Sequence, residues 1–251
     1  MNENIKKLHI RSENGDADAQ NALGVCYAVG DGVEQDFEKA FHWYMKSAEQ
    51  GNAVAQLNVA GMYGRGYGTV KDLDKMMEWL QKALDQNLAM AQYNMGYAYV
   101  TGDCGVTQDF EKAFYFYMKA AEQGYPDAQY EIAVMYAKGE YVEEDLAEAH
   151  RWYLMAAKNG LATAQHTVAA QYACGIGVEV DDKKAFKWCE KAAKQGYAPA
   201  QFNLGCMYND DYPGIKQNSE EARKWFIRSA EQGYEPAVEK LDADGITFHN
   251  N

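Results

Sequence analysis

The sequence predicts an all-α fold built from six copies of a two-helix unit. One stretch is spelled almost identically twice, since residues 30–51 read GDGVEQDFEKAFHWYMKSAEQG and residues 102–124 read GDCGVTQDFEKAFYFYMKAAEQG. Ala-Gln pairs also recur at intervals of 36 or 37 residues. A period of this length is typical of solenoid proteins, in which stacked units share one core. The pairs begin at Ala19, Ala55, Ala91, Ala128, Ala164 and Ala200.

From this repeat pattern we predict that residues 1–251 form a single repeat domain with partial units at both ends. The stretch IRSENGDADAQ before the first repeat resembles KSAEQGNAVAQ within it, so residues 1–18 are expected to form a lone second helix that caps the array. Residues 237–251 begin a further unit that stops short, which predicts a partial C-terminal helix and a tail. The six repeats are residues 19–54, 55–90, 91–127, 128–163, 164–199 and 200–236.

The first helix of each unit is predicted from the pattern AQNALGVCYAVG at residues 19–30. Apolar or small residues recur there at i, i+4 and i+7 to i+8, the spacing of one helix face. One position inside this helix holds only glycine or alanine. Because glycine costs a helix about 1 kcal/mol relative to alanine, we expect a neighbouring helix to approach closely there. The position is occupied by Gly24, Ala60, Gly96, Ala133, Ala169 and Gly205.

The second helix is predicted from the pattern DFEKAFHWYMKSAEQG at residues 36–51. An Asp or Asn side chain precedes it in every copy and can accept hydrogen bonds from the free N–H groups of the first turn. A Gly or Asn follows it, and these residues tolerate the left-handed conformation of a helix C-cap. The starts are Asp36, Asp72, Asp109, Asp145, Asp181 and Asn218, and the ends are Gly51, Asn87, Gly124, Gly160, Gly196 and Gly233.

The aromatic residues follow the same register. All five tryptophans share one repeat position, which Phe116 fills in the remaining copy, and six tyrosines share another. A residue present in every copy cannot mark a single site, so both sets are predicted to belong to the core. The tryptophans are Trp43, Trp79, Trp152, Trp188 and Trp225, and the tyrosines are Tyr27, Tyr63, Tyr99, Tyr136, Tyr172 and Tyr208.

This pattern resembles the Sel-one-like repeat (SLR) family, a relative of the tetratricopeptide repeats. The resemblance covers residues 15–236 and implies an antiparallel helix-pair solenoid that winds into a right-handed superhelix with a concave face. It also implies an adaptor that holds other proteins rather than transforming substrates. The second repeat departs most from the family, with Met76, Leu80, Leu84 and Asn87 in place of Ala, Tyr, Ala and Gly. The residues that carry the resemblance include Ala22-Leu23-Gly24, Tyr27, Gly30, Gly32-Val33, Asp36, Lys39-Ala40, Trp43-Tyr44, Lys46 and Gly51.

Composition and charge argue against several classes of function. Five cysteines without CxxC spacing argue against a disulfide framework and a zinc site, so no metal or cofactor is expected. The net charge of −13 argues against a nucleic-acid surface, and no apolar run approaches the length of a membrane span. A monomer is expected. If Met1 is the native start the protein is expected in the cytoplasm, and a removed signal peptide would instead make it secreted or periplasmic.

No arrangement typical of an enzyme is present, so the chain is predicted not to be one. The histidines form no HExxH motif and no close pair of ligand spacing. The residues His166 and Cys174 lie eight positions apart, about 80° around a helix axis. A hydrolase that uses one of these two residues is kept as an alternative from a different class.

A groove on the first helices is the favoured place for a function. At 100° per residue, the positions two, six and nine after each repeat start lie opposite the core arc of the first helix. They would line an apolar groove if the first helices form the concave surface, whereas tight winding would partly bury them. Gly61 and Gly64 would leave a hollow in that groove. The predicted partner-contact residues are Leu57, Arg65, Tyr93, Tyr97, Tyr130, Lys138, His166 and Phe202, with Arg65 and Lys138 near the rim to meet a carboxylate.

The predicted function is therefore a scaffold or adaptor that binds a protein or peptide along the concave face. The acidic charge leaves open an inhibitor or immunity-type protein that masks a basic toxin or enzyme. Binding through charge should weaken steeply with salt, whereas binding in an apolar groove should depend on salt less.

Overall fold

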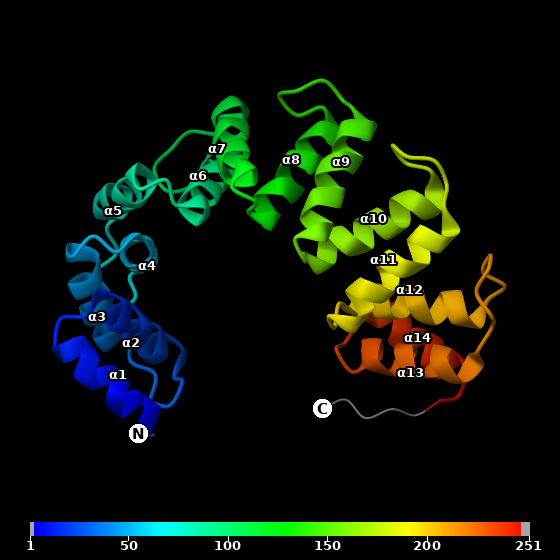
Figure 1. Ribbon diagram of the computed structural model, residues 1–251, viewed down its shortest axis with the longest axis horizontal. Coiled ribbons are helices and arrows are strands. Elements are labelled where there is room, and N and C mark those ends of the chain that lie inside the picture. Colours follow the sequence, from blue (N-terminus) through cyan, green and yellow to red (C-terminus); the bar gives the residue numbers. More distant parts are fainter. Residues whose placement is uncertain (1–2, 247–251) are drawn as a thin grey trace. The chain divides into compact units, whose positions relative to one another are not determined.

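The computed structural model describes residues 3–246, which form fourteen α-helices and no strand (Figure 1). First and second helices alternate in the predicted register, which confirms the all-α, helix-pair fold. The helices are α1 (Glu3–Glu13), α2 (Ala17–Val29), α3 (Phe37–Glu49), α4 (Ala53–Arg65), α5 (Leu73–Asp85), α6 (Ala89–Thr101), α7 (Phe110–Glu122), α8 (Pro126–Lys138), α9 (Leu146–Lys158), α10 (Ala162–Cys174), α11 (Asp182–Lys194), α12 (Ala198–Asn209), α13 (Ser219–Ala230) and α14 (Glu235–Ala243).

The chain divides into two compact units, residues 1–120 and 121–251. In the N-terminal unit each helix from α1 to α5 packs on the next one, and in the C-terminal unit the same holds from α8 to α14. Helix α1 is the expected lone second helix and α14 the expected partial first helix. Residues 1–2 and the tail beyond residue 246 lie outside the described residues.

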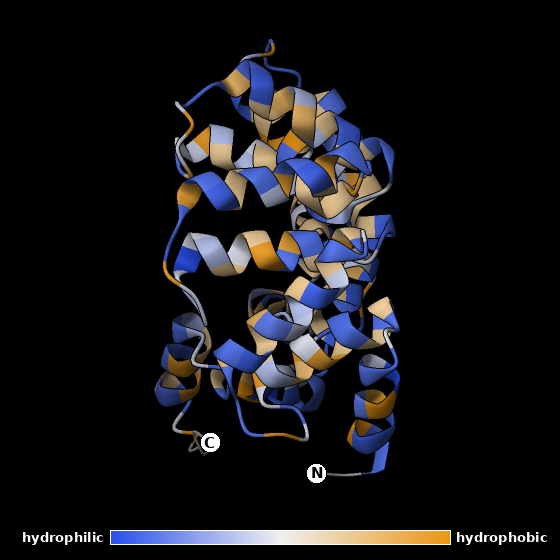
Figure 2. Ribbon diagram, turned by 90° about the vertical axis from the view of Figure 1, so that its left-hand side faces the viewer, coloured by the Kyte–Doolittle hydropathy of each residue, from blue (hydrophilic) through white to orange (hydrophobic). Residues whose placement is uncertain are grey.

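The second helices are amphipathic, whereas hydrophobic and hydrophilic residues are mixed around the first helices; Figure 2 colours the ribbon by hydropathy. No helix within residues 3–246 is both long and apolar enough to cross a membrane.

The helix ends follow the predicted chemistry. The Asp36 side chain accepts a hydrogen bond of 2.9 Å from the backbone N–H of Lys39, and Asn218 accepts one of 3.1 Å from Glu221. Every residue predicted to end a second helix has a positive φ, including Asn87 at 59°. The local sequence therefore sets where each second helix starts and stops.

The glutamine of each Ala-Gln pair is buried, and in five copies it ties three helices together. Gln20 on α2 donates from Nε2 to the carbonyl oxygen of Ser12 at the end of α1, and its Oε1 accepts from Nε2 of Gln50 at the end of α3. The nitrogen and the oxygen of the Gln20 side-chain amide are thus both hydrogen-bonded inside the core, as buried polar groups generally are. The same bridge is made by Gln56 with Gln86, Gln129 with Asn159, Gln165 with Gln195, and Gln201 with Gln232.

The glycines inside the first helices make room for aromatic rings. A Cβ added to Gly24 would lie 2.5 Å from the ring of Tyr44, and one added to Gly205 would lie 2.6 Å from the ring of Phe226. A Cβ added to Gly96 would likewise lie 2.5 Å from the ring of Tyr117. All three rings are buried. The predicted close approach is therefore confirmed, and it involves the residue that follows the tryptophan position.

The tryptophan position lies at the edge of the core rather than in its centre. Trp43 and Trp225 are buried, whereas Trp79, Trp152 and Trp188 are half-buried and pack against the core clusters. The predicted place of the tryptophans in the core is therefore confirmed, at the edge of the core for these three. A cation three residues further along covers the outer ring face in four copies, because the indole face attracts positive charge. These cations are Lys46, Lys82, Lys191 and Arg228, at 3.7 to 4.7 Å from the ring centroids.

Candidate functional site

The residues two positions after each repeat start are less accessible than predicted. Leu57 is 7% exposed and belongs to a core cluster, so its predicted place on a solvent-facing arc is wrong. Tyr93, Tyr130 and Phe202 are half-buried. Helices α2, α4, α10 and α12 each pack on two second helices, their own and the preceding one, which widens the buried arc beyond a single face. The alternative of partial burial therefore holds at this position.

Ring contacts show what holds these half-buried side chains. The ring centroids lie 5.6 Å apart for Tyr93 and Tyr117 and 5.0 Å apart for Tyr130 and Tyr153. Phe202 lies 5.6 Å from Phe226. In each case the partner is on the second helix of the same repeat, so these side chains support the helix pair.

His166 is also part of the packing between first helices. Its Nε2 lies 2.8 Å from Nδ2 of Asn203 on α12, and its ring contacts Tyr197. Burial lowers the pKa of the imidazole, which favours the neutral form. Among the described residues no hydrogen bond joins His166 to Cys174.

The position six residues after each repeat start is more accessible and carries no charged residue in any copy. We call these six residues the uncharged row. Tyr97 is the most prominent, with 53% of its surface exposed, and Val25 is 41% exposed. Three of them lie in each unit. The uncharged row consists of Val25, Gly61 and Tyr97 in the N-terminal unit and Val134, Ala170 and Cys206 in the C-terminal unit.

A pocket of about 580 Å³ opens between α4, α5 and α6 in the N-terminal unit. Its lining includes Leu57, Gly61, Arg65 and Tyr97, so a hollow lies where the glycines of the second repeat predict one. A Cβ added to Gly61 would meet nothing within 4 Å. The pocket is open at this residue because the side chain is missing.

Gly64 also lines this pocket but has a different role. A Cβ added there would lie 2.8 Å from the sulfur of Met76. The other five repeats have alanine where the second repeat has Met76. Gly64 therefore accommodates the longer side chain of Met76, and it is Gly61 that leaves the space.

Two cations line the pocket, Arg65 and Lys71. Within residues 3–246 neither makes an ion pair, whereas Lys138, at the position of Arg65 in the fourth repeat, pairs with Glu140 at 3.5 Å. One carboxylate, Asp103, lines the same pocket. Burial, followed by the charge of Asp103, raises the pKa of the Cys104 thiol, and Lys71 opposes this shift. Positive charge thus exceeds negative charge around this pocket, in a chain of net charge −13. Lys138 is not among the residues that line this pocket, so its predicted place near the rim of the hollow is wrong.

Lys71 is not among the residues predicted from the sequence, although its position carries a signal. In three other repeats this position holds a glutamine whose Nε2 donates to the carbonyl oxygen seven or eight residues earlier, near the end of the first helix. The fourth and fifth repeats have Glu144 and Val180 there, and the second repeat alone has a cation, which is the signal that the sequence offers. The three capping pairs are Gln35 with Ala28, Gln108 with Val100, and Gln217 with Asn209.

A second pocket, of about 310 Å³, lies between α10 and α12 and is lined by His166, Cys174, Cys189 and Cys206. Burial raises the pKa of the Cys189 thiol to about 12 and also raises that of Cys206. A nucleophilic cysteine needs a lowered pKa instead. These two thiols are therefore protonated packing residues. The described residues contain no group of three or more His, Cys, Asp or Glu side chains that could hold a metal ion.

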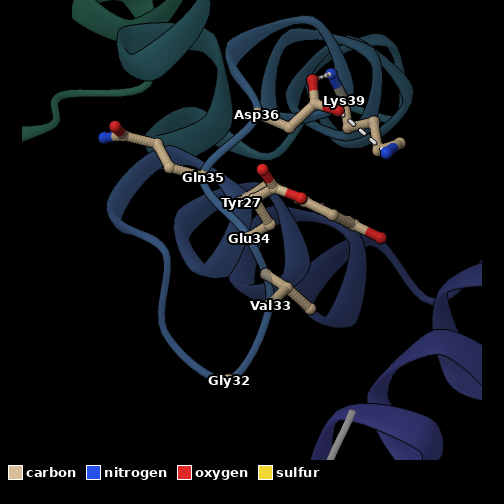
Figure 3. Close-up of a pocket in the computed structure, with 7 residues that line it drawn as sticks. All are labelled: Tyr27, Gly32, Val33, Glu34, Gln35, Asp36 and Lys39. Carbon is tan, nitrogen blue, oxygen red and sulfur yellow. Dashed lines mark hydrogen bonds and ion pairs between the residues drawn. The ribbon is translucent and has the colours of Figure 1, made fainter.

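A crevice of about 450 Å³ beside Asp36 is a feature of the repeat (Figure 3). Asp36 pairs with Nζ of Lys39 at 2.8 Å, and this nitrogen lies 5.5 Å from the ring centroid of Tyr27. The contact lowers the pKa of Asp36 and raises that of Lys39. Because the arrangement recurs in three other repeats, it indicates architecture rather than one binding site. The other sets are Asp72, Lys75 and Tyr63; Asp109, Lys112 and Tyr99; and Asp181, Lys184 and Tyr172.

Comparison with protein families gives a match over nearly the whole chain. A family model described as Sel1 repeat matches residues 17–52, 53–88, 89–125, 126–161, 162–197 and 198–234. Comparison with curated proteins gives no match.

Solved structures agree with this result. The chain is similar to a Sel1 repeat protein from Oxalobacter formigenes, with 32% identity and a TM-score of 0.80 over 91% of this chain and 99% of that chain. It is also similar to a protective antigen of uropathogenic Escherichia coli that displays an SLR fold, with 33% identity and a TM-score of 0.76 over 97% of this chain and 53% of that chain. The chain therefore spans about half the length of that antigen. An immunity protein from Pseudomonas aeruginosa, at 23% identity and a TM-score of 0.58 over 88% of this chain and 83% of that chain, shares the fold alone.

Proposed function

The chain belongs to the Sel1 repeat family, and from this premise we propose that it is a binding module for a protein or peptide, with a contact surface built by its first helices. Sel1 repeat proteins typically mediate interactions between proteins, and the family is generally not enzymatic. The observation that carries the proposal is the uncharged row. It is accessible in four of its six copies, at Val25, Gly61, Tyr97 and Ala170, and it holds no charged residue although 24% of the chain is charged.

An accessible row without charges is a surface that gains from being covered. Burial of apolar area contributes about 25 cal/mol per Å², and contiguous apolar surface on a folded protein commonly marks a contact site. Tyr97 has the features of an anchor, because its ring offers apolar area and its hydroxyl can form a hydrogen bond. We therefore assign the main contact to Tyr97 and the residues beside it on α4 and α6.

The test captures a partner from the source cells with the full chain, identifies it by mass spectrometry and then titrates it against variants. Tyr97→Ala should weaken binding by about tenfold or more, as expected for an interface anchor. The matched control is Tyr115→Ala, since Tyr115 is 52% exposed but lies on the second helix α7. Its affinity should stay within about twofold of wild type. The opposite ranking would place the contact on the second helices and contradict the proposal.

An alternative within the same class is the masking of a basic protein by the acidic surface. It is supported by the net charge of −13. The likeness to an immunity protein concerns the fold alone and adds nothing to it. The captured complex separates the two roles, because affinity that falls steeply between low and high salt indicates charge-driven binding.

A further inference from the structure

Four departures of the second repeat from the other five meet in one pocket. Met76 replaces an alanine, Leu80 stands where three copies have tyrosine, and Lys71 replaces the capping glutamine of three copies. Gly61 stands where no other copy has glycine. All four residues line the pocket of about 580 Å³ between α4, α5 and α6. Leu84 and Asn87 also depart but are not part of this lining, whereas these four residues surround a single cavity.

The floor of this pocket is apolar. Leu57, Ala60, Met76 and Leu80 line it, and each of them is buried. The space above them is open at Gly61, as described above. A ligand that fills this floor must therefore supply an apolar group.

The edge of the pocket is positively charged. Arg65 and Lys71 are exposed, and the lining contains one acidic residue, Asp103. In the part of the chain that the structure describes, neither cation is engaged in an ion pair, so their charge is available to a ligand. The ligand that fits combines an apolar group with a negative charge a few atoms away.

We propose that this pocket binds the C-terminal residue of a peptide or protein partner, with an apolar side chain on the floor and the α-carboxylate at Arg65 and Lys71. A C-terminal leucine or methionine carries both groups on one residue. An internal Asp or Glu carries the charge but no apolar branch to reach the floor. The volume lies in the range of about 300–1,000 Å³ that holds small ligands, which leaves room for a terminal residue. This inference rests on the proposed function and specifies its ligand.

The chain offers variants that test the pocket without disturbing the fold. Lys71→Gln introduces the residue that caps the first helix in three other repeats, and Arg65→Gln changes an exposed side chain. Lys138→Gln is the matched control, since it removes the cation at the same position of the fourth repeat. Gly61→Val fills the pocket with the residue that stands at this position in the first and fourth repeats, and a Cβ added at Gly61 meets nothing within 4 Å.

The experiment titrates the ¹⁵N-labelled full chain with small probes and follows backbone amide shifts. N-acetyl-leucine, which carries the free carboxylate, should shift the amides of Gly61, Gly64 and Tyr97 saturably, at millimolar concentration as expected for so small a ligand. N-acetyl-leucinamide should bind at least about tenfold more weakly, because it lacks the charge. The Arg65→Gln, Lys71→Gln double variant should lose about the same factor for N-acetyl-leucine, and Lys138→Gln should lose none. Gly61→Val should abolish binding of both probes.

Three outcomes would overturn the proposal. Equal binding of the acid and the amide would show that the cations do not recognise a carboxylate. Equal or tighter binding of N-acetyl-aspartate α-amide would show that the pocket recognises an internal acidic side chain. The absence of any saturable shift would show that the pocket holds no terminal residue. If partner capture nevertheless depends on Tyr97, the binding module stands and only the ligand assigned to the pocket is wrong.

Discussion

The side-chain amide of Gln50 donates a hydrogen bond of 2.7 Å to the Oε1 of Gln20, thirty residues earlier in the chain. Gln20 in turn donates to the carbonyl oxygen of Ser12. One buried amide thus links the ends of two successive second helices through the first helix between them. Since this bridge is repeated along the array, it is a main connection between neighbouring repeats.

Removing one such amide should weaken the fold measurably. In the C-terminal unit Gln165 donates to the carbonyl oxygen of Ala157 and accepts from Gln195. Gln165→Ala removes both of these hydrogen bonds, although the carbonyl of Ala157 still accepts from the backbone N–H of Gly160 at 3.2 Å. The loss of the two bonds should lower the free energy of unfolding by about 1–3 kcal/mol. Gln195→Ala should cost less, because Gln195 is exposed and water can replace it. Urea unfolding of the two variants checks this, and equal midpoints would contradict it.

The glycines of the first helices should respond in opposite ways to the same substitution. Gly205→Ala places a methyl group against the ring of Phe226, and overpacking of this kind costs about 1–3 kcal/mol. Gly61→Ala meets open space and should stabilise the helix by about 0.5–1 kcal/mol. Chemical denaturation of both variants measures the difference. Similar effects in the two would show that the ring does not determine the choice of glycine.

The same clash suggests a rescue. The second repeat combines Ala60 with Leu80 where the first combines Gly24 with Tyr44. Gly24→Ala alone should destabilise the protein, and adding Tyr44→Leu should recover part of the loss because the smaller side chain leaves room for the methyl group. A double-mutant cycle should give a coupling of about 0.5–3 kcal/mol between the two residues. Strict additivity would mean that they do not share the space.

The thiols should differ in reactivity. All five cysteines are free, Cys174 is exposed, and burial raises the pKa of Cys189 to about 12. Because the thiolate is the reactive form, iodoacetamide at pH 8 should modify Cys174 first and Cys189 only after unfolding. Mass spectrometry of the labelled peptides tests this order. The melting temperature should hardly change when reductant is added, since no disulfide joins these cysteines.

The raised pKa of Cys189 also predicts a pH dependence. The unfolded thiol loses its proton near pH 9, whereas the folded one keeps it to about pH 12. Between these values the unfolded chain binds fewer protons, so stability is fully present below pH 9 and falls as the pH rises. The Cys189→Ala variant should lose less stability than wild type between pH 8 and 10.5 in urea unfolding. A steeper loss in the variant would contradict this assignment.

The fold could be predicted from the sequence because its determinants are local or repeated. Asp36 and Gly51 mark the ends of one helix through contacts within a few residues, and the same signals recur in every copy. The bridge between Gln20 and Gln50 could not be predicted in this way, because it depends on how three helices pack. Only part of the pocket could be predicted from the sequence. Gly61 indicated a hollow, but the place of Lys71 at its edge became clear only from the contact that the glutamine makes in other repeats.

The exposure of the first-helix tyrosines was harder to predict, because it depends on how widely two second helices cover the first. Tyr130 packs against Tyr153 at 5.0 Å, whereas Tyr97 is 53% exposed. Tyr130→Ala should therefore lower the free energy of unfolding by about 1–2 kcal/mol, through lost burial and the lost ring contact. Tyr97→Ala should change it by about 0.5 kcal/mol or less, as for an exposed residue. Denaturant unfolding of the two variants measures this directly. Equal losses would show that Tyr97 is also a packing residue, and a weaker affinity of Tyr97→Ala for its partner could then not be attributed to a direct contact.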